Sequence, residues 1–115
     1  MTWATVRGWI LPALKPDDGT EAELLADIIA GRATLWTGAR CAMVTQFVTE
    51  ATGKCVHAWL AGGDLNEIVA LVPGIEAFAR TGGCTHATVM GRAGWRRKLE
   101  PLGYRQCGEE LKKVL

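Results

Sequence analysis

The pattern of hydrophobic and polar positions changes period several times along the chain, and each change marks an expected element. Residues 3–11 form an apolar segment closed by a proline, and we expect a strand there. Thr20 and Glu23 fit a capping box, in which each side chain satisfies a free backbone amide at a helix start. Apolar residues then recur at helical spacing, which predicts a helix over residues 20–30 that Gly31 ends.

The middle of the chain has the composition of paired strands. Residues 41–49 and 55–61 are rich in β-branched and aromatic residues and flank a short turn, which predicts an antiparallel hairpin. Asp64 can cap a helix over residues 64–82, in which a Pro-Gly pair can cause a kink or a break. Residues 84–90 have the pattern of a further strand, and a strand–helix–strand crossover of this kind pairs its two strands in parallel.

The C-terminal segment predicts one short helix over residues 95–102 and one last strand over residues 105–115. An antiparallel hairpin that leads into a single parallel crossover gives a mixed sheet rather than a purely parallel one. The chain is therefore expected to form one domain over residues 1–115. Its class is α/β (α+β), with a mixed, twisted sheet and helices on both faces.

Composition narrows the function classes. The formal net charge is +1, so no bulk electrostatic attraction to nucleic acid or to a membrane surface is expected. No apolar run reaches the roughly 18 residues that a membrane span needs. The first residues lack a secretory signal pattern, and the four cysteines are too widely spaced for a disulfide framework to be expected. We therefore expect reduced thiols and a cytoplasmic protein.

The order of residues near the C-terminus resembles a known fold. Residues 83–104 combine a buried strand, a glycine-punctuated turn, a short basic helix and the exit Leu102-Gly103-Tyr104. This order resembles the C-terminal half of the Gcn5-related N-acetyltransferase (GNAT) fold, and the resemblance covers about residues 20–115. The chain also resembles small GNAT-like proteins of tailed phages and prophages. This further resemblance rests on Gly31…Leu35-Trp36, Gly83-Cys84 and Gly91-Arg92-x-Gly94-Trp95.

The resemblance implies a place for the phosphates of acetyl-CoA. GNAT enzymes carry a glycine-rich loop after the fourth strand, whose amides and following helix start hold the pyrophosphate. The matching cofactor-binding positions here are Gly62, Gly63, Asp64, Leu65 and Asn66. The usual Arg or Gln lead-in and the Gly-x-Gly are absent, and Asp64 adds a negative charge where a phosphate would lie. A turn followed by an aspartate cap is the plainer interpretation.

The resemblance also implies a proton donor, usually a tyrosine a few residues before the Leu-Gly-aromatic exit. Leu99 occupies that position, and Tyr104 matches the core aromatic of the exit. A leucine cannot protonate a leaving thiolate. Glu50 or Glu67 is a candidate base, although glutamates of this kind usually lie on a solvated surface.

A second constellation offers a metal site as a weaker alternative to plain sheet packing. Cys55-x-His57-Ala58 and Cys84-x-His86-Ala87 repeat the same spacing, and residues two apart share one face of a strand. On parallel neighbouring strands, Cys55, His57, Cys84 and His86 would converge as a zinc site. The alternatives are a Cys–His nucleophile pair and plain sheet packing, since cysteine is among the most buried residue types.

A basic segment offers a candidate partner surface. Arg92, Trp95, Arg96 and Arg97 combine an aromatic ring with clustered guanidinium groups, which are typical anchors at protein interfaces. A nucleic acid could stack on the same groups but is a weaker expectation. The plainer alternative is that Trp95 only anchors a basic helix whose other face is solvated.

Two functions therefore remain open. The first is a non-catalytic GNAT-like protein of phage or prophage type that binds a protein in the virion or the host, or forms a homo-oligomer. It would lie in the host cytoplasm or in the virion, and it needs an exposed apolar patch with a tryptophan or a dimer. The alternative is an N-acetyltransferase that uses acetyl-CoA. It needs a cleft between the strands expected over residues 55–61 and 84–90, faced by free amides of residues 62–66 and not filled by Trp59 or Leu65.

Overall fold

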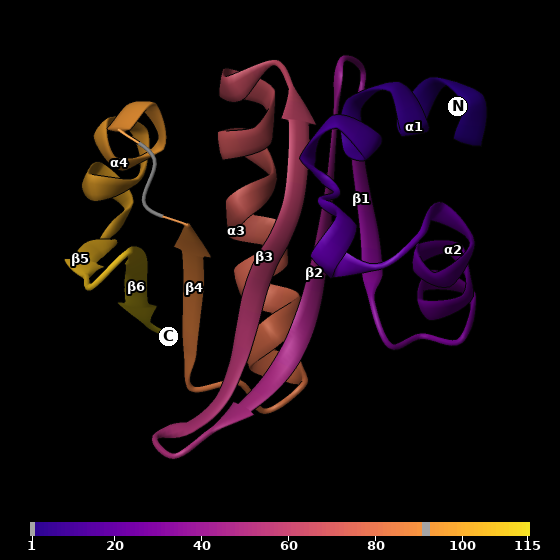
Figure 1. The fold of residues 1–115 in the computed structure, drawn as a ribbon. Helices are drawn as coiled ribbons and strands as arrows, with labels where there is room; N and C mark the ends of the chain where they lie inside the picture. The colour runs from indigo at the N-terminus through magenta and orange to yellow at the C-terminus, as the bar shows by residue number, and fades with distance from the viewer. Residues whose placement is uncertain (1, 91–92) are drawn as a thin grey trace.

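The computed structural model describes residues 2–90 and 93–115, which form a mixed sheet with helices on both faces (Figure 1). The elements, in chain order, are α1 (Trp3–Ile10), η1 (Leu11–Ala13), η2 (Pro16–Asp18), α2 (Glu21–Ile29), β1 (Thr34–Gly38), β2 (Cys41–Glu50), β3 (Gly53–Gly63), α3 (Leu65–Thr81), β4 (His86–Met90), α4 (Ala93–Leu99), η3 (Glu100–Leu102), β5 (Arg105–Cys107) and β6 (Glu110–Val114).

The six strands lie in the order β1-β2-β3-β4-β6-β5. β1, β2 and β3 form an antiparallel meander, and α3 then carries the chain to β4, which pairs with β3 in parallel. β6 pairs antiparallel with both β4 and β5. The predicted hairpin, the parallel crossover and the mixed sheet are confirmed.

Two hydrophobic clusters lie on opposite faces of the sheet. α3 and α4 pack with Val56, Ala87 and Val89 in one cluster, behind the sheet in Figure 1. α1 and α2 pack in the other cluster, against Val44 and Leu60, in front of the sheet. The front helices cover β1, the first half of β2 and the second half of β3, so no helix of the described residues lies over the front face of the first half of β3 or of β4 and β6.

The expected strand over residues 3–11 is wrong, because this segment forms α1 and then η1. Val6 and Ile10 lie four residues apart and are the buried residues of α1, which is the spacing of one helix face. A short apolar run fits either a strand or a buried helix segment, so its pattern alone could not distinguish them.

Three smaller expectations also changed. The single strand expected over residues 105–115 is a hairpin, in which Gly108 has a φ of 63° at the turn between β5 and β6. β3 extends through Gly63 instead of ending before Gly62. Pro73 lies inside one continuous helix, so it does not split α3.

Both predicted helix starts are confirmed. Thr20 Oγ1 accepts a hydrogen bond from the Glu23 amide at 3.2 Å, and Glu23 Oε1 accepts one from the Thr20 amide at 3.2 Å. Asp64 Oδ1 accepts a hydrogen bond from the Glu67 amide at 3.0 Å. Each cap satisfies amides that the helix itself leaves free.

Candidate functional site

β3 and β4 diverge halfway along β3. Their parallel register runs only from Cys55 opposite His86 to Ala58 opposite Val89, while β3 continues for five more residues to Gly63. On the other side of β3, the pairing with β2 shifts at the same point. Val44 pairs with Leu60 and Thr45 with Ala58, so Trp59 is the extra residue of a β-bulge. A bulge leaves its extra residue unpaired and bends the strand.

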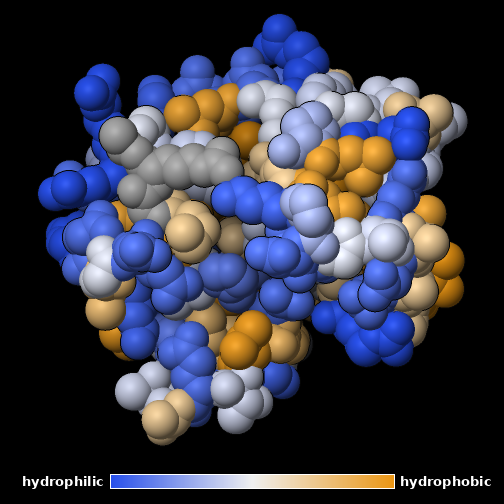
Figure 2. Space-filling view, in the orientation of Figure 1, coloured by the Kyte–Doolittle hydropathy of each residue, from blue (hydrophilic) through white to orange (hydrophobic). Residues whose placement is uncertain are grey.

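A groove of about 440 Å³ opens where the strands diverge. Its lining combines aromatic, apolar and charged side chains: Ala13, Lys15, Asp18, His57, Ala58, Trp59, Leu60, Ala61, Met90, Trp95 and Glu109. Figure 2 shows this side of the molecule, with hydrophilic residues across its middle and hydrophobic residues on either side. A groove between these strands is therefore present and Trp59 forms part of its wall, but residues 62–66, whose amides the acetyltransferase alternative needs, are not among its lining residues.

His57 is the basic side chain of the groove wall that is best placed for proton transfer. Its Nδ1 lies 2.8 Å from Thr88 Oγ1 and 3.5 Å from Glu110 Oε2. The imidazole is half-buried, so one end of the ring can reach a ligand in the groove while the other is held. A histidine oriented in this way can accept a proton from a bound amine.

The expected phosphate-loop residues are engaged in the fold. A Cβ on Gly62 would lie 2.0 Å from the Trp9 carbonyl oxygen, and one on Gly63 would lie 2.2 Å from the Arg40 carbonyl oxygen. The Asp64 amide donates to that Arg40 oxygen at 2.9 Å. The two glycines therefore allow α1 and the β1–β2 turn to approach, rather than a ligand.

The remaining two positions of that loop also do not form a phosphate cradle. Leu65 lines a small cavity of about 30 Å³ on the α3 face of the sheet, and Asn66 is exposed in the first turn of α3. Asp64 places its carboxylate at the helix start. These residues are a poor fit to the pyrophosphate of CoA, because the Asp64 amide already donates to Arg40, the two glycines are packed against other backbone, and the Asp64 carboxylate would repel a phosphate.

The positions considered for acid–base chemistry by resemblance lie elsewhere. Leu99 is buried, and Tyr104 is a buried core residue whose hydroxyl donates to Glu76 Oε2 at 2.8 Å. Burial, helped by the Glu76 carboxylate, raises the pKa of Tyr104 above its usual range. Glu67 accepts hydrogen bonds from the Arg40 amide and Nε, and these lower the pKa of its carboxyl.

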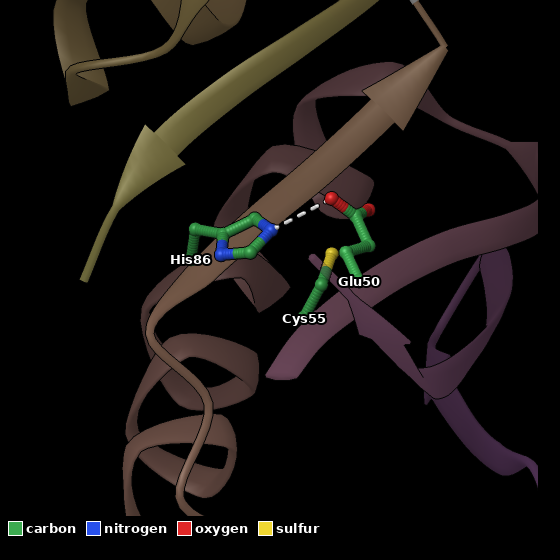
Figure 3. Close-up of side chains that lie close together, drawn as sticks. All are labelled: Glu50, Cys55 and His86. Carbon is green, nitrogen blue, oxygen red and sulfur yellow. Dashed lines mark hydrogen bonds and ion pairs between the residues drawn. The ribbon is translucent and has the colours of Figure 1, made fainter. Parts of the chain in front are cut away.

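The repeated Cys-x-His pairs are brought together only in part. Figure 3 shows Cys55 and the imidazole of His86 beside the carboxylate of Glu50, which lies 3.2 Å from His86 Nε2. His57 turns to Thr88, and Cys84 packs in the cluster under α3. The hydrogen bond from His86 lowers the pKa of Glu50.

The predicted partner segment is only partly a surface. Trp95 lines the groove and the small cavity, and Arg96 pairs with Glu100 at 2.8 Å. Arg97 is exposed, whereas Arg92 lies outside the described residues. The exposed large hydrophobic residues of the described chain include no tryptophan and are Ile29, Val48, Phe78, Met90 and Val114.

Comparison with protein-family models, curated proteins and solved structures found no match to this chain. The GNAT resemblance therefore stays a prediction. Among the described residues, no helix is long and apolar enough to cross a membrane.

Sequence reasoning missed the bulge at Trp59 and the contribution of the N-terminal segment to the groove. The run Ala58-Trp59-Leu60-Ala61 breaks the alternation of β3, and such a break is a signal of a bulge. Nothing in the sequence indicated that Lys15 and Asp18 belong to the groove. They lie in a turn that is far in the sequence from the β3 residues of the groove wall.

Proposed function

We propose that this chain is a non-catalytic, GNAT-like binding domain, and that its groove takes an extended segment of a partner protein. The observation that carries the proposal is the coincidence of two features at Trp59. The strand loses its β4 neighbour there, and the bulge removes its β2 partner.

An open strand edge binds extended peptides by adding them as a further strand. The main-chain hydrogen bonds then supply affinity, and pockets beside the edge select side chains. β3 offers its backbone from Trp59 to Ala61, the part of the unpaired edge that lines the groove, for this purpose. Trp59, Met90 and Trp95 supply apolar walls for a side chain of the bound segment.

The charges of the groove favour a neutral or basic peptide. Among the described residues that line the groove, the two carboxylates of Asp18 and Glu109 stand against one ammonium group, that of Lys15. Like charges placed together in a site disfavour binding, so a ligand with several phosphates is a poor match and a lysine-bearing segment is a good one.

Three features of the chain support a GNAT-like fold as part of the proposal. An antiparallel hairpin precedes a single parallel crossover, a short basic helix follows β4, and Tyr104 of the Leu-Gly-Tyr exit is buried. The partner would be a virion or host protein, as the resemblance to phage proteins implies.

His57 favours a second candidate, an N-acetyltransferase. Acetyl-CoA would supply the acetyl group, and His57 would accept a proton from an amine bound in the groove. The misfit of Gly62, Gly63 and Asp64 to the pyrophosphate places this candidate second.

The test is calorimetry with two probes. The first is an acetylated and amidated hexapeptide of alternating lysine and valine, with a copy methylated on its backbone amides as its control. The second is acetyl-CoA. Each is titrated into the native protein and into Met90→Arg, which adds bulk and charge to the groove wall. Val114→Arg makes the same change at an exposed position of β6, outside the groove.

We expect saturable binding of the hexapeptide to the native protein and to Val114→Arg. Binding should be lost in Met90→Arg and for the methylated peptide, because main-chain donors carry the recognition. Equal binding to all variants, or no binding of the hexapeptide, would overturn the proposal. Binding of acetyl-CoA alone would replace it with the second candidate.

A further inference from the structure

Three side chains with metal-ligating atoms meet on the uncovered face of the sheet, away from the groove. The carboxylate of Glu50, the sulfur of Cys55 and a ring nitrogen of His86 all lie within 4.8 Å of one another (Figure 3). The fold fixes this meeting, because Cys55 and His86 are direct partners in the β3–β4 register and Glu50 ends the adjacent β2. We propose that Glu50, Cys55 and His86 bind a zinc ion.

The hydrogen bonds of His86 orient its ring toward the other two groups. Nδ1 lies 2.9 Å from Thr85 Oγ1, and that hydroxyl lies 3.3 Å from the Lys54 carbonyl oxygen, to which it can donate. Thr85 can then accept the Nδ1 proton, which leaves Nε2 as the ring atom that would bind the ion. Nε2 lies 3.2 Å from Glu50 Oε2, so these two ligand atoms already lie side by side. A second hydrogen bond that fixes the ring is the usual arrangement of a metal-ligating histidine.

Cys55 would supply a thiolate ligand. It is fully buried, with an exposed fraction of 0%, and this burial raises the pKa of its thiol, so the ion itself must stabilise the thiolate. Thr88 Oγ1 lies 3.2 Å from its sulfur and can donate a hydrogen bond to the thiolate. Glu50 is exposed, so the ion can enter from its side of the cluster.

The donor set selects zinc. Thiolate, imidazole and carboxylate are its usual ligands, and bond lengths of about 2.0–2.3 Å around a tetrahedral ion separate ligand atoms by roughly 3.3–3.7 Å. The 3.2 Å between Glu50 Oε2 and His86 Nε2 is already close to that range, and all three ligand atoms lie within 4.8 Å of one another. On binding, the Cys55 thiol releases its proton to solvent and the Cys55–zinc bond forms. Thiolate and carboxylate then balance the two charges of the ion, and a water completes the fourth position.

This site differs from the one that the sequence suggested. Cys55 and His86 remain, Glu50 joins them, and Cys84 and His57 point elsewhere. No proposed zinc ligand lines the peptide groove, although Thr88 Oγ1 contacts both Cys55 and His57. Variants of Glu50 and of Met90 therefore let the two proposals fail separately.

The experiment titrates ZnCl₂ into protein that was made metal-free with a chelator. Calorimetry in two buffers of different ionisation enthalpy measures affinity, stoichiometry and proton release. Cobalt(II) is used in parallel, because a cobalt–thiolate bond gives a charge-transfer absorption that other ligands do not. The variants are Cys55→Ser and Glu50→Gln. The control is Cys107→Ser, which removes the exposed free thiol.

We expect one zinc ion per chain, release of protons on binding, and a thiolate band with cobalt(II). Loss of a direct ligand in Cys55→Ser should weaken binding at least about 100-fold, since removing outer-shell partners alone costs 10–100-fold. Glu50 is exposed, so Glu50→Gln should leave the fold intact, and it should also weaken zinc binding. Cys107→Ser should bind as the native protein does. Absence of binding, or binding that survives Cys55→Ser and is lost in Cys107→Ser, would overturn the proposal.

Discussion

The two faces of the sheet bury side chains by different means. Under α3 the face is apolar, and its buried carboxylate, Glu76, is held by Tyr104 and by Lys113 at 2.9 Å. The front face is apolar only beneath α1 and α2. Where no helix covers this face, Cys55 and His86 are buried, and their polar atoms form hydrogen bonds with threonines and a glutamate.

The difference shows where ligand chemistry can reside in a small domain. Apolar burial stabilises the covered parts, whereas uncovered buried groups must be polar and paired. Among the described residues, every buried side-chain nitrogen and oxygen has a hydrogen-bond partner. Both proposed sites lie on the uncovered half of the front face, one at the zinc cluster and one at the boundary with α1.

The largest expected effect is on the covered part of the front face. Ile10→Ala removes a side chain that is fully buried between α1 and the sheet, and it should lower the free energy of unfolding by about 2–5 kcal/mol. Ile29→Ala is the matched control, because Ile29 is 84% exposed. Its effect should stay within about 0.5 kcal/mol in urea unfolding. Similar losses for both variants would contradict the assignment of α1 to the core.

A smaller loss is expected from the polar group buried under α3. Tyr104→Phe removes the donor to Glu76, and hydrogen bonds to charged groups are worth about 1.5–3 kcal/mol. Urea unfolding of this variant, of Glu76→Gln and of the double variant gives the coupling between the two residues. Additive losses would show that this hydrogen bond is absent.

The contact between α1 and β3 gives the next effect. Gly62→Ala forces a methyl group against the Trp9 carbonyl and should cost about 1–3 kcal/mol. Gly74→Ala, in open space inside α3, should instead raise stability by about 0.5–1 kcal/mol. If Gly62→Ala is tolerated as well as Gly74→Ala, the glycine does not serve the approach of α1.

The smallest effect concerns the ion pair between α1 and α2. Hydrogen bonds from Arg7 Nε at 2.7 Å and from Trp3 lower the pKa of Glu21 to about 2. A carboxyl with a lowered folded pKa contributes stability above its ordinary pKa of 4.5, and this is lost as the pH falls from there toward 2. A carbon-detected titration should give a higher pKa in Arg7→Gln. An unchanged pKa of Glu21 in this variant would show that the ion pair with Arg7 does not form.

The parts of the fold that the sequence predicted depend on local signals. Thr20 with Glu23 and Asp64 gave the helix starts, and the β-branched runs gave β2 and β3, because caps and strand alternation are short-range patterns. α1 was missed, since its burial depends on partners in β2 and β3. The groove was missed for the same reason.

The candidate sites were predicted to a lesser extent. The spacing of Cys55 and His86 indicated a metal cluster, but only the register could replace Cys84 by Glu50. The GNAT resemblance directed attention to Gly62 and Gly63, whose role in packing is visible only when Trp9 and Arg40 are in place.

The most direct test of the central claim is a nitrogen–proton correlation spectrum of the labelled protein during titration with the lysine–valine hexapeptide. We predict progressive shifts of the amides of Trp59, Leu60 and Ala61, where β3 has lost its β4 neighbour. The amides of Cys55 and Val56, which lie in the paired part of the strand, should not move. Shifts that spread evenly over β3, or no shift at Trp59 at saturating peptide, would contradict the claim that the divergence of β3 and β4 is the binding site.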